Sequence, residues 1–205
     1  MGISSSINRL AIVPIFVGCV FVSCNPSGKT KVIVKKIDQE WSFNQVDGVL
    51  SGKAIVPSTI HTDLLAANLI EDPFHRTNEK DLQWIDKEDW EYKTAITITQ
   101  EELKKEHLSL FFEGLDTYAD VYFNDALLLE ANNMFREWEI DIKSYALEGN
   151  NELRVYLHSP IKKGFEKYDH SPYAYPAVND QSVNGGLNEP HLYDFEVKLI
   201  KDLSL

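Results

Sequence analysis

The sequence predicts an all-β protein, an antiparallel jelly-roll β-sandwich with one short helix. From Trp41 onward, short runs of alternating apolar and polar residues are separated by turn residues, the pattern of strands with one buried and one solvated face. One clear segment, which begins at Pro57, has helical spacing instead. The 205 residues are 43% hydrophobic and 25% charged, a composition typical of a globular domain.

The first strands are expected at WSF (residues 41–43) and KAIV (residues 53–56). The helix follows at once: Ser58 can cap its first turn, and leucine and isoleucine recur at helical spacing over residues 60–69. Residues 71–89 carry charges of both signs without periodicity, so a loop is expected there. Together these segments lead into the main series of strands.

Five further strands are expected from apolar residues at every second position. The inward-facing sets are Trp90, Tyr92, Thr94, Ile96 and Ile98; Leu108, Leu110 and Phe112; Ala119, Val121 and Phe123; Trp138, Ile140 and Ile142; and Leu153, Val155 and Leu157. Asn124-Asp125 and residues 149–151 (GNN) are typical of hairpin connections, and Gly114 is expected to supply an unusual backbone angle in a turn.

The pattern changes after Pro160. Residues 162–186 have the composition of a loop, and residues 190–202 alternate again, which predicts a final strand. We therefore expect the sandwich core in residues 33–160 and a divergent tail in residues 161–205.

The N-terminal residues predict export. Residues 1–23 contain one charged side chain, Arg9, and an apolar run of residues 10–22 that is shorter than the about 20 residues of a membrane-spanning helix but fits a secretory signal. Residues 21–24 (FVSC) resemble a bacterial lipobox, which implies a lipoprotein signal peptide over residues 1–23, lipid attachment at Cys24 and a tether over residues 24–32. A lipid-anchored protein of the bacterial periplasm or outer membrane is expected. A cleaved signal with an incidental cysteine, or processing at Cys19, is the alternative.

The net charge of the chain excludes some classes of binding partner. Its 20 basic and 32 acidic residues give a net charge of −12, which repels nucleic-acid phosphates and anionic lipid headgroups. We expect no nucleic-acid partner, and membrane contact through the lipid anchor alone.

Several motifs occur in an order that resembles one family. They are VPSTIHTDLL from residue 56, IEDPFHRTNEKDLQWIDKEDWEY from residue 70, EGLDTYADVYFN from residue 113, NNMF from residue 132 and GNNELRVYLHSP from residue 149. Together they are similar to the N-terminal domain of bacterial β-mannosidases of glycoside hydrolase family 2. The resemblance implies a galactose-binding-domain-like jelly roll and a link to the degradation of β-mannoside glycans by an exo-acting enzyme.

The sequence also departs from this family. Its catalytic glutamates lie on a later (β/α)₈ barrel of around 250 residues, whereas 45 residues follow Pro160, so no catalytic residue is carried over. A Trp-Asp-Trp-Gly loop that should follow residues 175–177 has no counterpart, and residues 185–202 resemble the end of the family's second domain, as if joined near residues 180–183. We expect a truncated chain that is not catalytic alone, and leave open a partner chain that supplies the barrel.

Sugar contact is a weaker expectation. Trp84 lies between acidic residues in a predicted loop and is a candidate for stacking on a pyranose. Tyr173 and Tyr175, in the later aromatic segment, are further candidates for sugar contact. Trp90 and Trp138 are expected in the core instead. The six histidines show no metal-binding spacing, so neither a metal nor another cofactor is expected. A surface carbohydrate-binding lipoprotein and a decayed gene fragment remain alternative interpretations.

Overall fold

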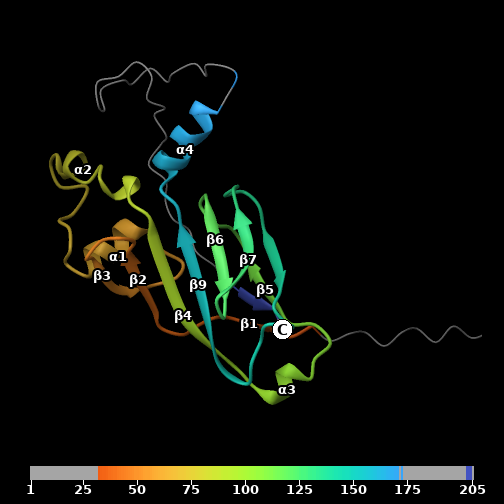
Figure 1. Ribbon diagram of the computed structural model, residues 1–205. Coiled ribbons are helices and arrows are strands. Elements are labelled where there is room, and N and C mark those ends of the chain that lie inside the picture. The colour runs from red at the N-terminus through yellow and green to blue at the C-terminus, as the bar shows by residue number, and fades with distance from the viewer. Residues whose placement is uncertain (1–31, 171, 173–201, 205) are drawn as a thin grey trace, which may run out of the picture. The chain divides into compact units, whose positions relative to one another are not determined.

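The computed structural model describes residues 32–170, residue 172 and residues 202–204. Cys24, Tyr173 and Tyr175, together with the predicted junction near residues 180–183 and all but the last residue of the predicted final strand, lie outside these residues. Two antiparallel sheets make up the described part of the chain, which confirms the all-β fold class (Figure 1).

The larger sheet carries six strands in the order β3-β2-β4-β9-β6-β7. Their bounds are β2 (Trp41–Gln45), β3 (Ser51–Ala54), β4 (Trp90–Ile98), β6 (Ala119–Phe123), β7 (Ala126–Ala131) and β9 (Gly149–Leu157). The smaller sheet has the order β1-β10-β5-β8, from β1 (Val34–Lys35), β5 (Ser109–Phe112), β8 (Trp138–Asp141) and β10 (Asp202–Ser204). Strands β4 and β9 pair over nine residues each and form the centre of the larger sheet.

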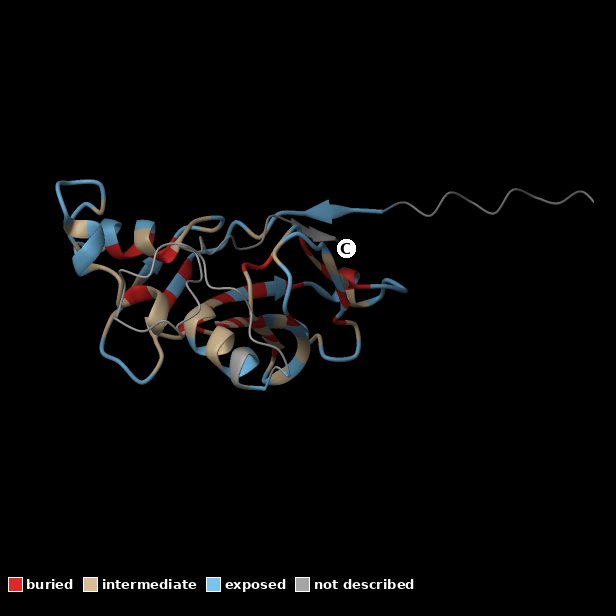
Figure 2. Cartoon of the chain, turned by 90° about the horizontal axis from the view of Figure 1, so that it is seen from above, coloured by how far each residue is buried: buried red, intermediate tan, exposed pale blue. Residues whose placement is uncertain are grey.

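Apolar side chains at alternate positions along the strands of both sheets pack into one core. Every second residue of β4 and β9 is buried, as the sequence predicts, and apolar residues of β5 and β6 join the same cluster. Figure 2 shows buried and more exposed residues alternating along the strands. Trp138 confirms the core prediction only in part: it packs against this cluster, but it is half-buried on the edge strand β8, where the guanidinium carbon of Arg136 lies 4.4 Å from its ring centroid. Truncating one of the large aromatic side chains of the core to alanine would lower the free energy of unfolding of the protein by about 3–5 kcal/mol.

The described residues contain more helix than the single one predicted. They include α1 (Ile60–Ala66), α2 (Asn78–Asp81), the 3₁₀ turn η1 (Ile85–Lys87), α3 (Gln100–Leu103) and α4 (Pro160–Asp169). The loops predicted at residues 71–89 and 162–186 were therefore wrong in part, since α2, η1 and most of α4 lie there. In the part of the chain that the structure covers, none of these helices combines the length and apolar character that crossing a membrane requires.

The cap of α1 also differs from the prediction. Thr59, not Ser58, is the N-cap, and its hydroxyl accepts the backbone N–H of Thr62 at 3.2 Å. Ser58 instead donates its hydroxyl to the carboxylate of Asp63 at 2.7 Å. Residues 58 and 59 therefore have two roles: Ser58 donates a hydrogen bond to a buried acid, and Thr59 caps the helix.

Asp63 is that buried acid, with 2% of its surface exposed. Its carboxylate accepts hydrogen bonds from the backbone N–H of Ile55 at 3.1 Å and from the hydroxyl of Tyr92 at 2.9 Å, in addition to Ser58. Burial, followed by the negative charge and hydrogen bond of Asp63, raises the pKa of Tyr92 far above its usual value of 10. The phenol therefore stays protonated and ties β4 to α1.

Two turns differ in why they need their residue types: the hairpin between β6 and β7 needs positive φ angles, and the turn at Gly114 needs space for a neighbouring backbone segment. Asn124 and Asp125 both have positive φ, 57° being typical of the left-handed region, and their values of 47° and 67° fit the predicted tight hairpin between β6 and β7. Gly114 was predicted to have an unusual backbone angle, and this is wrong: its φ is not positive, and a Cβ added there would lie 3.0 Å from the carbonyl oxygen of Met134. Glycine is needed for close approach of two backbone segments.

Residues 149–151 (GNN) were predicted to be a hairpin connection, and this is wrong: they begin β9, which pairs with β4 and β6 and not with the preceding strand β8. The motif is explained by Asn151, whose side chain is buried at the start of β9. Its carbonyl oxygen accepts the backbone N–H of Leu147 and the side-chain amide of Asn124, both at 2.7 Å, and its amide donates to the carbonyls of Leu147 and Gly149. One asparagine thus holds the turn before β9 against the β6–β7 hairpin.

Candidate functional site

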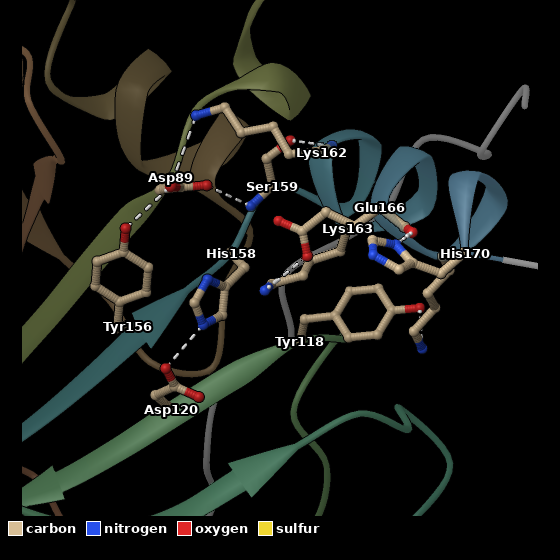
Figure 3. Close-up of polar contacts among 11 residues, drawn as sticks. Asp89, Tyr118, Asp120, Tyr156, His158, Ser159, Lys162, Lys163, Glu166 and His170 are labelled. Atoms are coloured by element: carbon tan, nitrogen blue, oxygen red, sulfur yellow. Dashed lines mark hydrogen bonds and ion pairs between the residues drawn. The ribbon is translucent and has the colours of Figure 1, made fainter. Parts of the chain in front are cut away.

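Polar side chains gather where β9 ends and α4 begins. We name them the α4 cluster, which consists of Asp86, Asp89, Tyr118, Asp120, Tyr156, His158, Ser159, Lys162 and Lys167. Figure 3 labels all of them except Asp86 and Lys167. They come from η1, β4, β6, β9 and α4 and from the segments just beside them. The cluster therefore brings distant parts of the chain to one end of the larger sheet.

Asp89, the residue before β4, is the centre of this cluster. One carboxylate oxygen accepts the backbone N–H of Ser159 at 2.7 Å, and the other accepts the hydroxyl of Tyr156 at 2.9 Å and lies 3.6 Å from the ammonium of Lys162. Burial, and then the hydrogen bond and charge of Asp89, raise the pKa of Tyr156 well above its usual value of 10, so the phenol remains a donor. Asp89 thus binds the end of β9 and the first turn of α4 together.

Ser159 begins α4 from a fully buried position. Its hydroxyl donates to the backbone carbonyl of Asp86 at 2.7 Å and accepts the backbone N–H of Lys162 at 3.1 Å. A serine that accepts an N–H three residues later, followed by proline at the first helical position, is the usual start of a helix. The Ser159-Pro160 pair is the sequence signal for the start of α4, which the loop predicted from residue 162 did not take into account.

Two further contacts support α4 and the sheet beneath it. His158 Nε2 lies 2.8 Å from Asp120 Oδ2 across β9 and β6, and its ring packs 4.7 Å from that of Tyr156. The ammonium of Lys167 lies 4.3 Å from the ring centroid of Tyr118 and donates to its hydroxyl at 3.0 Å. A cation over an aromatic face in this geometry is attractive. Lys167 thus gives α4 a second attachment, in its last turn.

The cluster contains a serine, a histidine and aspartates, but not in the geometry of a nucleophilic triad. A triad needs the serine hydroxyl within hydrogen-bond reach of the histidine. Here the hydroxyl of Ser159 donates to a backbone carbonyl, and His158 contacts Asp120 instead. The contacts of these side chains fix the position of a helix, so the arrangement is suited to holding structure in place.

The outward face of the larger sheet carries a second polar group. The carboxylate of Glu91 lies 3.0 Å from the guanidinium of Arg154 and 2.8 Å from the ammonium of Lys93, and that guanidinium lies 3.9 Å from the ring centroid of Tyr122. Burial alone would raise the pKa of Glu91, but hydrogen bonds and charge from Lys93 and Arg154 hold it below its usual value of 4.5. This network joins β4, β9 and β6 across the face.

The sequence-predicted sugar contact Trp84 is half-buried beside the core. Its ring centroid lies 6.2 Å from that of Trp90, with the planes tilted by 46°. No ligand contact tests the predicted stacking, which stays a prediction. Of the acids in the motif at residues 113–124, Asp120 binds His158 and Asp116 accepts the hydroxyl of Thr117. Among the described residues, no group of three or more histidines, cysteines and acids is placed to hold a metal.

The chain is similar to known proteins over most of its length. A family model described as "Glycosyl hydrolase 2 galactose-binding domain-like" matches residues 41–191. The β-mannosidase of Bos taurus is 29% identical over 164 residues, which cover 80% of this chain and 18% of that protein. β-Mannosidase B of Thermothelomyces thermophilus is 32% identical over 143 residues, 68% of this chain and 17% of that protein.

A solved structure gives the same result. The crystal structure of the β-D-mannosidase from Dictyoglomus thermophilum is similar with a TM-score of 0.73 and 34% identity, covering 85% of this chain and 22% of that one. The chain thus spans about a fifth of the length of these relatives. It belongs to the glycosyl hydrolase 2 galactose-binding domain-like family and is similar to the N-terminal domain of β-mannosidases.

Proposed function

We propose that these residues form the accessory sandwich domain of a β-mannoside-degrading glycoside hydrolase and do not cleave the glycosidic bond themselves. The observation that carries this proposal is the likeness to β-mannosidases in sequence and in fold over most of the chain. Those relatives are named for an activity that belongs to much longer proteins, so the role proposed for this domain is support of the catalytic module.

The α4 cluster supports an accessory role. A retaining glycosidase needs two carboxyl groups about 5–5.5 Å apart across a sugar site, one as acid/base and one as nucleophile. In the described cluster, Asp89 and Asp120 instead hold Ser159, Tyr156 and His158 in place. Rigid attachment of α4 gives the domain a fixed element with which to orient neighbouring parts of the enzyme.

Hydrolysis by the purified 205-residue chain tests this proposal. With an aryl β-mannoside as substrate, we expect no release of the phenol above the buffer blank. A homogeneous sample that turns over substrate would contradict the proposal, provided that the activity co-purifies with the chain and no larger protein is present.

We also propose that the protein is exported and lipid-anchored through Cys24. The apolar run of residues 10–22 and the FVSC sequence at residues 21–24 support this. Expressed in a bacterium fed radiolabelled palmitate, the wild-type chain is expected to incorporate label, Cys24→Ser to lose it and Cys19→Ser to keep it. Labelling that follows Cys19 instead, or no labelling of the wild type, would contradict the assignment.

A further inference from the structure

A surface cleft of about 380 Å³ lies between α1 and the α2–η1 segment. Its walls are formed by His61, Thr62 and Leu65 of α1, by Glu79, Leu82, Gln83 and Asp86 on the opposite side, and by Thr59, Pro73 and Phe74. The volume lies within the range of about 300–1,000 Å³ that small-molecule sites occupy. We propose that this cleft binds a neutral pyranose, with Phe74 as its stacking surface. The inference rests on the proposed glycan-related function and goes beyond it by assigning a site.

Phe74 is the first reason. Its side chain is 95% exposed, so it contributes little to the core. Its backbone is nevertheless held firmly: the N–H of Phe74 donates to the carboxylate of Asp72 at 2.9 Å, and the side-chain amide of Asn78 donates to the carbonyl of Asp72 at 2.9 Å. A fixed loop therefore presents an aromatic face to the cleft. The negative π face of phenylalanine complements the weakly positive C–H groups on one side of a pyranose.

The polar lining is the second reason. Gln83 is fixed by its own hydrogen bond to the carbonyl of Glu79 at 3.0 Å, and the hydroxyls of Thr59 and Thr62 bond to each other at 2.8 Å. Carboxylate, amide and hydroxyl groups supply both acceptors and donors, which sugar hydroxyls require. Leucine and proline line the remaining wall. An apolar surface with a few oriented polar groups is the usual design of a small-molecule site.

Charge decides the class of ligand. The lining includes two acids, Glu79 and Asp86, and neither lysine nor arginine. An anionic ligand such as a phosphate or a uronic acid would be repelled there. A neutral polyol is not repelled, and carboxylates accept hydrogen bonds from hydroxyl groups strongly. A primary amine, such as a lysine side chain of a protein partner, is the competing ligand, and the experiment distinguishes the two.

The test is an amide-shift titration of the full chain in detergent micelles. Methyl β-D-mannopyranoside and β-1,4-mannobiose are the sugar probes, and free lysine is the amine probe. We expect both sugars to bind in the millimolar range and to shift the amides of α1, Phe74 and Glu79. Phe74→Ala is expected to weaken binding roughly five- to tenfold because the stacking surface is lost.

Phe135→Ala is the matched control, since Phe135 is 90% exposed on a loop before β8 and does not line the cleft. It should leave the affinity unchanged, and both variants should keep the wild-type melting temperature. Shifts absent at saturating sugar, shifts outside the cleft, equal effects of the two variants, or tighter binding of lysine than of sugar would each overturn the site. Such a failure would leave the accessory role intact, because that role is tested by the hydrolysis assay.

Discussion

Asp63→Ala is expected to lower the free energy of unfolding by about 3–5 kcal/mol, because several donors lose their acceptor and each buried group left unsatisfied costs about 1–3 kcal/mol. Three donors converge on this carboxylate: the backbone N–H of Ile55 and the hydroxyls of Ser58 and Tyr92. Without Asp63 the hydroxyl of Tyr92 stays buried and loses its acceptor. Urea unfolding followed by tryptophan fluorescence measures the loss as a lower midpoint at unchanged slope.

Tyr92→Phe separates the hydrogen bond from the packing. It removes one donor and keeps the ring in the core, so a loss of about 1–2 kcal/mol is expected. The double variant Asp63→Ala/Tyr92→Phe should be less unstable than the sum of the single ones, because the two residues contact each other. Additive losses would contradict a direct bond between them.

The raised pKa of Tyr92 adds an alkaline signature. In the unfolded chain the phenol has its usual pKa of 10 and ionises once the pH exceeds that value. In the folded protein the pKa is raised, so the phenol stays protonated to higher pH. The stabilising contribution is therefore complete below pH 10 and is lost as the pH rises towards the folded pKa. Wild-type stability should fall in this alkaline range more steeply than that of Tyr92→Phe. Equal slopes would show that the buried phenol ionises freely.

Periodicity made most of the sandwich predictable because it is a local signal. The alternation of β4, β5, β6 and β9 correctly assigned their buried faces, and Asn124-Asp125 correctly indicated a hairpin. Strand β7 was missed, since its three consecutive leucines at residues 127–129 do not alternate, and it sits at an edge beside a register shift. An apolar run without a clear period does not predict either a strand or a helix from the sequence alone.

The candidate site was less predictable because its contacts are long-range. Asp89 and Ser159 are 70 positions apart, and Asp63 and Tyr92 are 29 apart. No window of sequence holds both members of either pair, so an acid beside a strand could be read only as a loop charge. Phe74 was likewise indistinguishable from an ordinary apolar residue, because only the fold shows that its ring remains exposed next to a cleft.

Asp89→Ala is expected to give the second large effect, a loss of about 2–4 kcal/mol concentrated at α4. The substitution removes the acceptor for the backbone N–H of Ser159 and for the hydroxyl of Tyr156, and Ser159 is fully buried. Hydrogen exchange measures the local result: amides in the first turns of α4 should exchange much faster, while those of β4 and β9 change only as far as global stability falls.

Lys162→Ala is the matched control for Asp89, because it removes only the 3.6 Å ion pair from a half-exposed lysine and should cost less than about 1 kcal/mol. If Asp89→Ala proved no more harmful than Lys162→Ala, the carboxylate would be a surface partner of the lysine and α4 would be held by other contacts. If α4 alone loses protection, the sheet and the helix are separate stability units, and Asp89 is the side chain on which their attachment depends most. The orientation of α4 then depends on a residue that lies before β4, far from the helix in sequence.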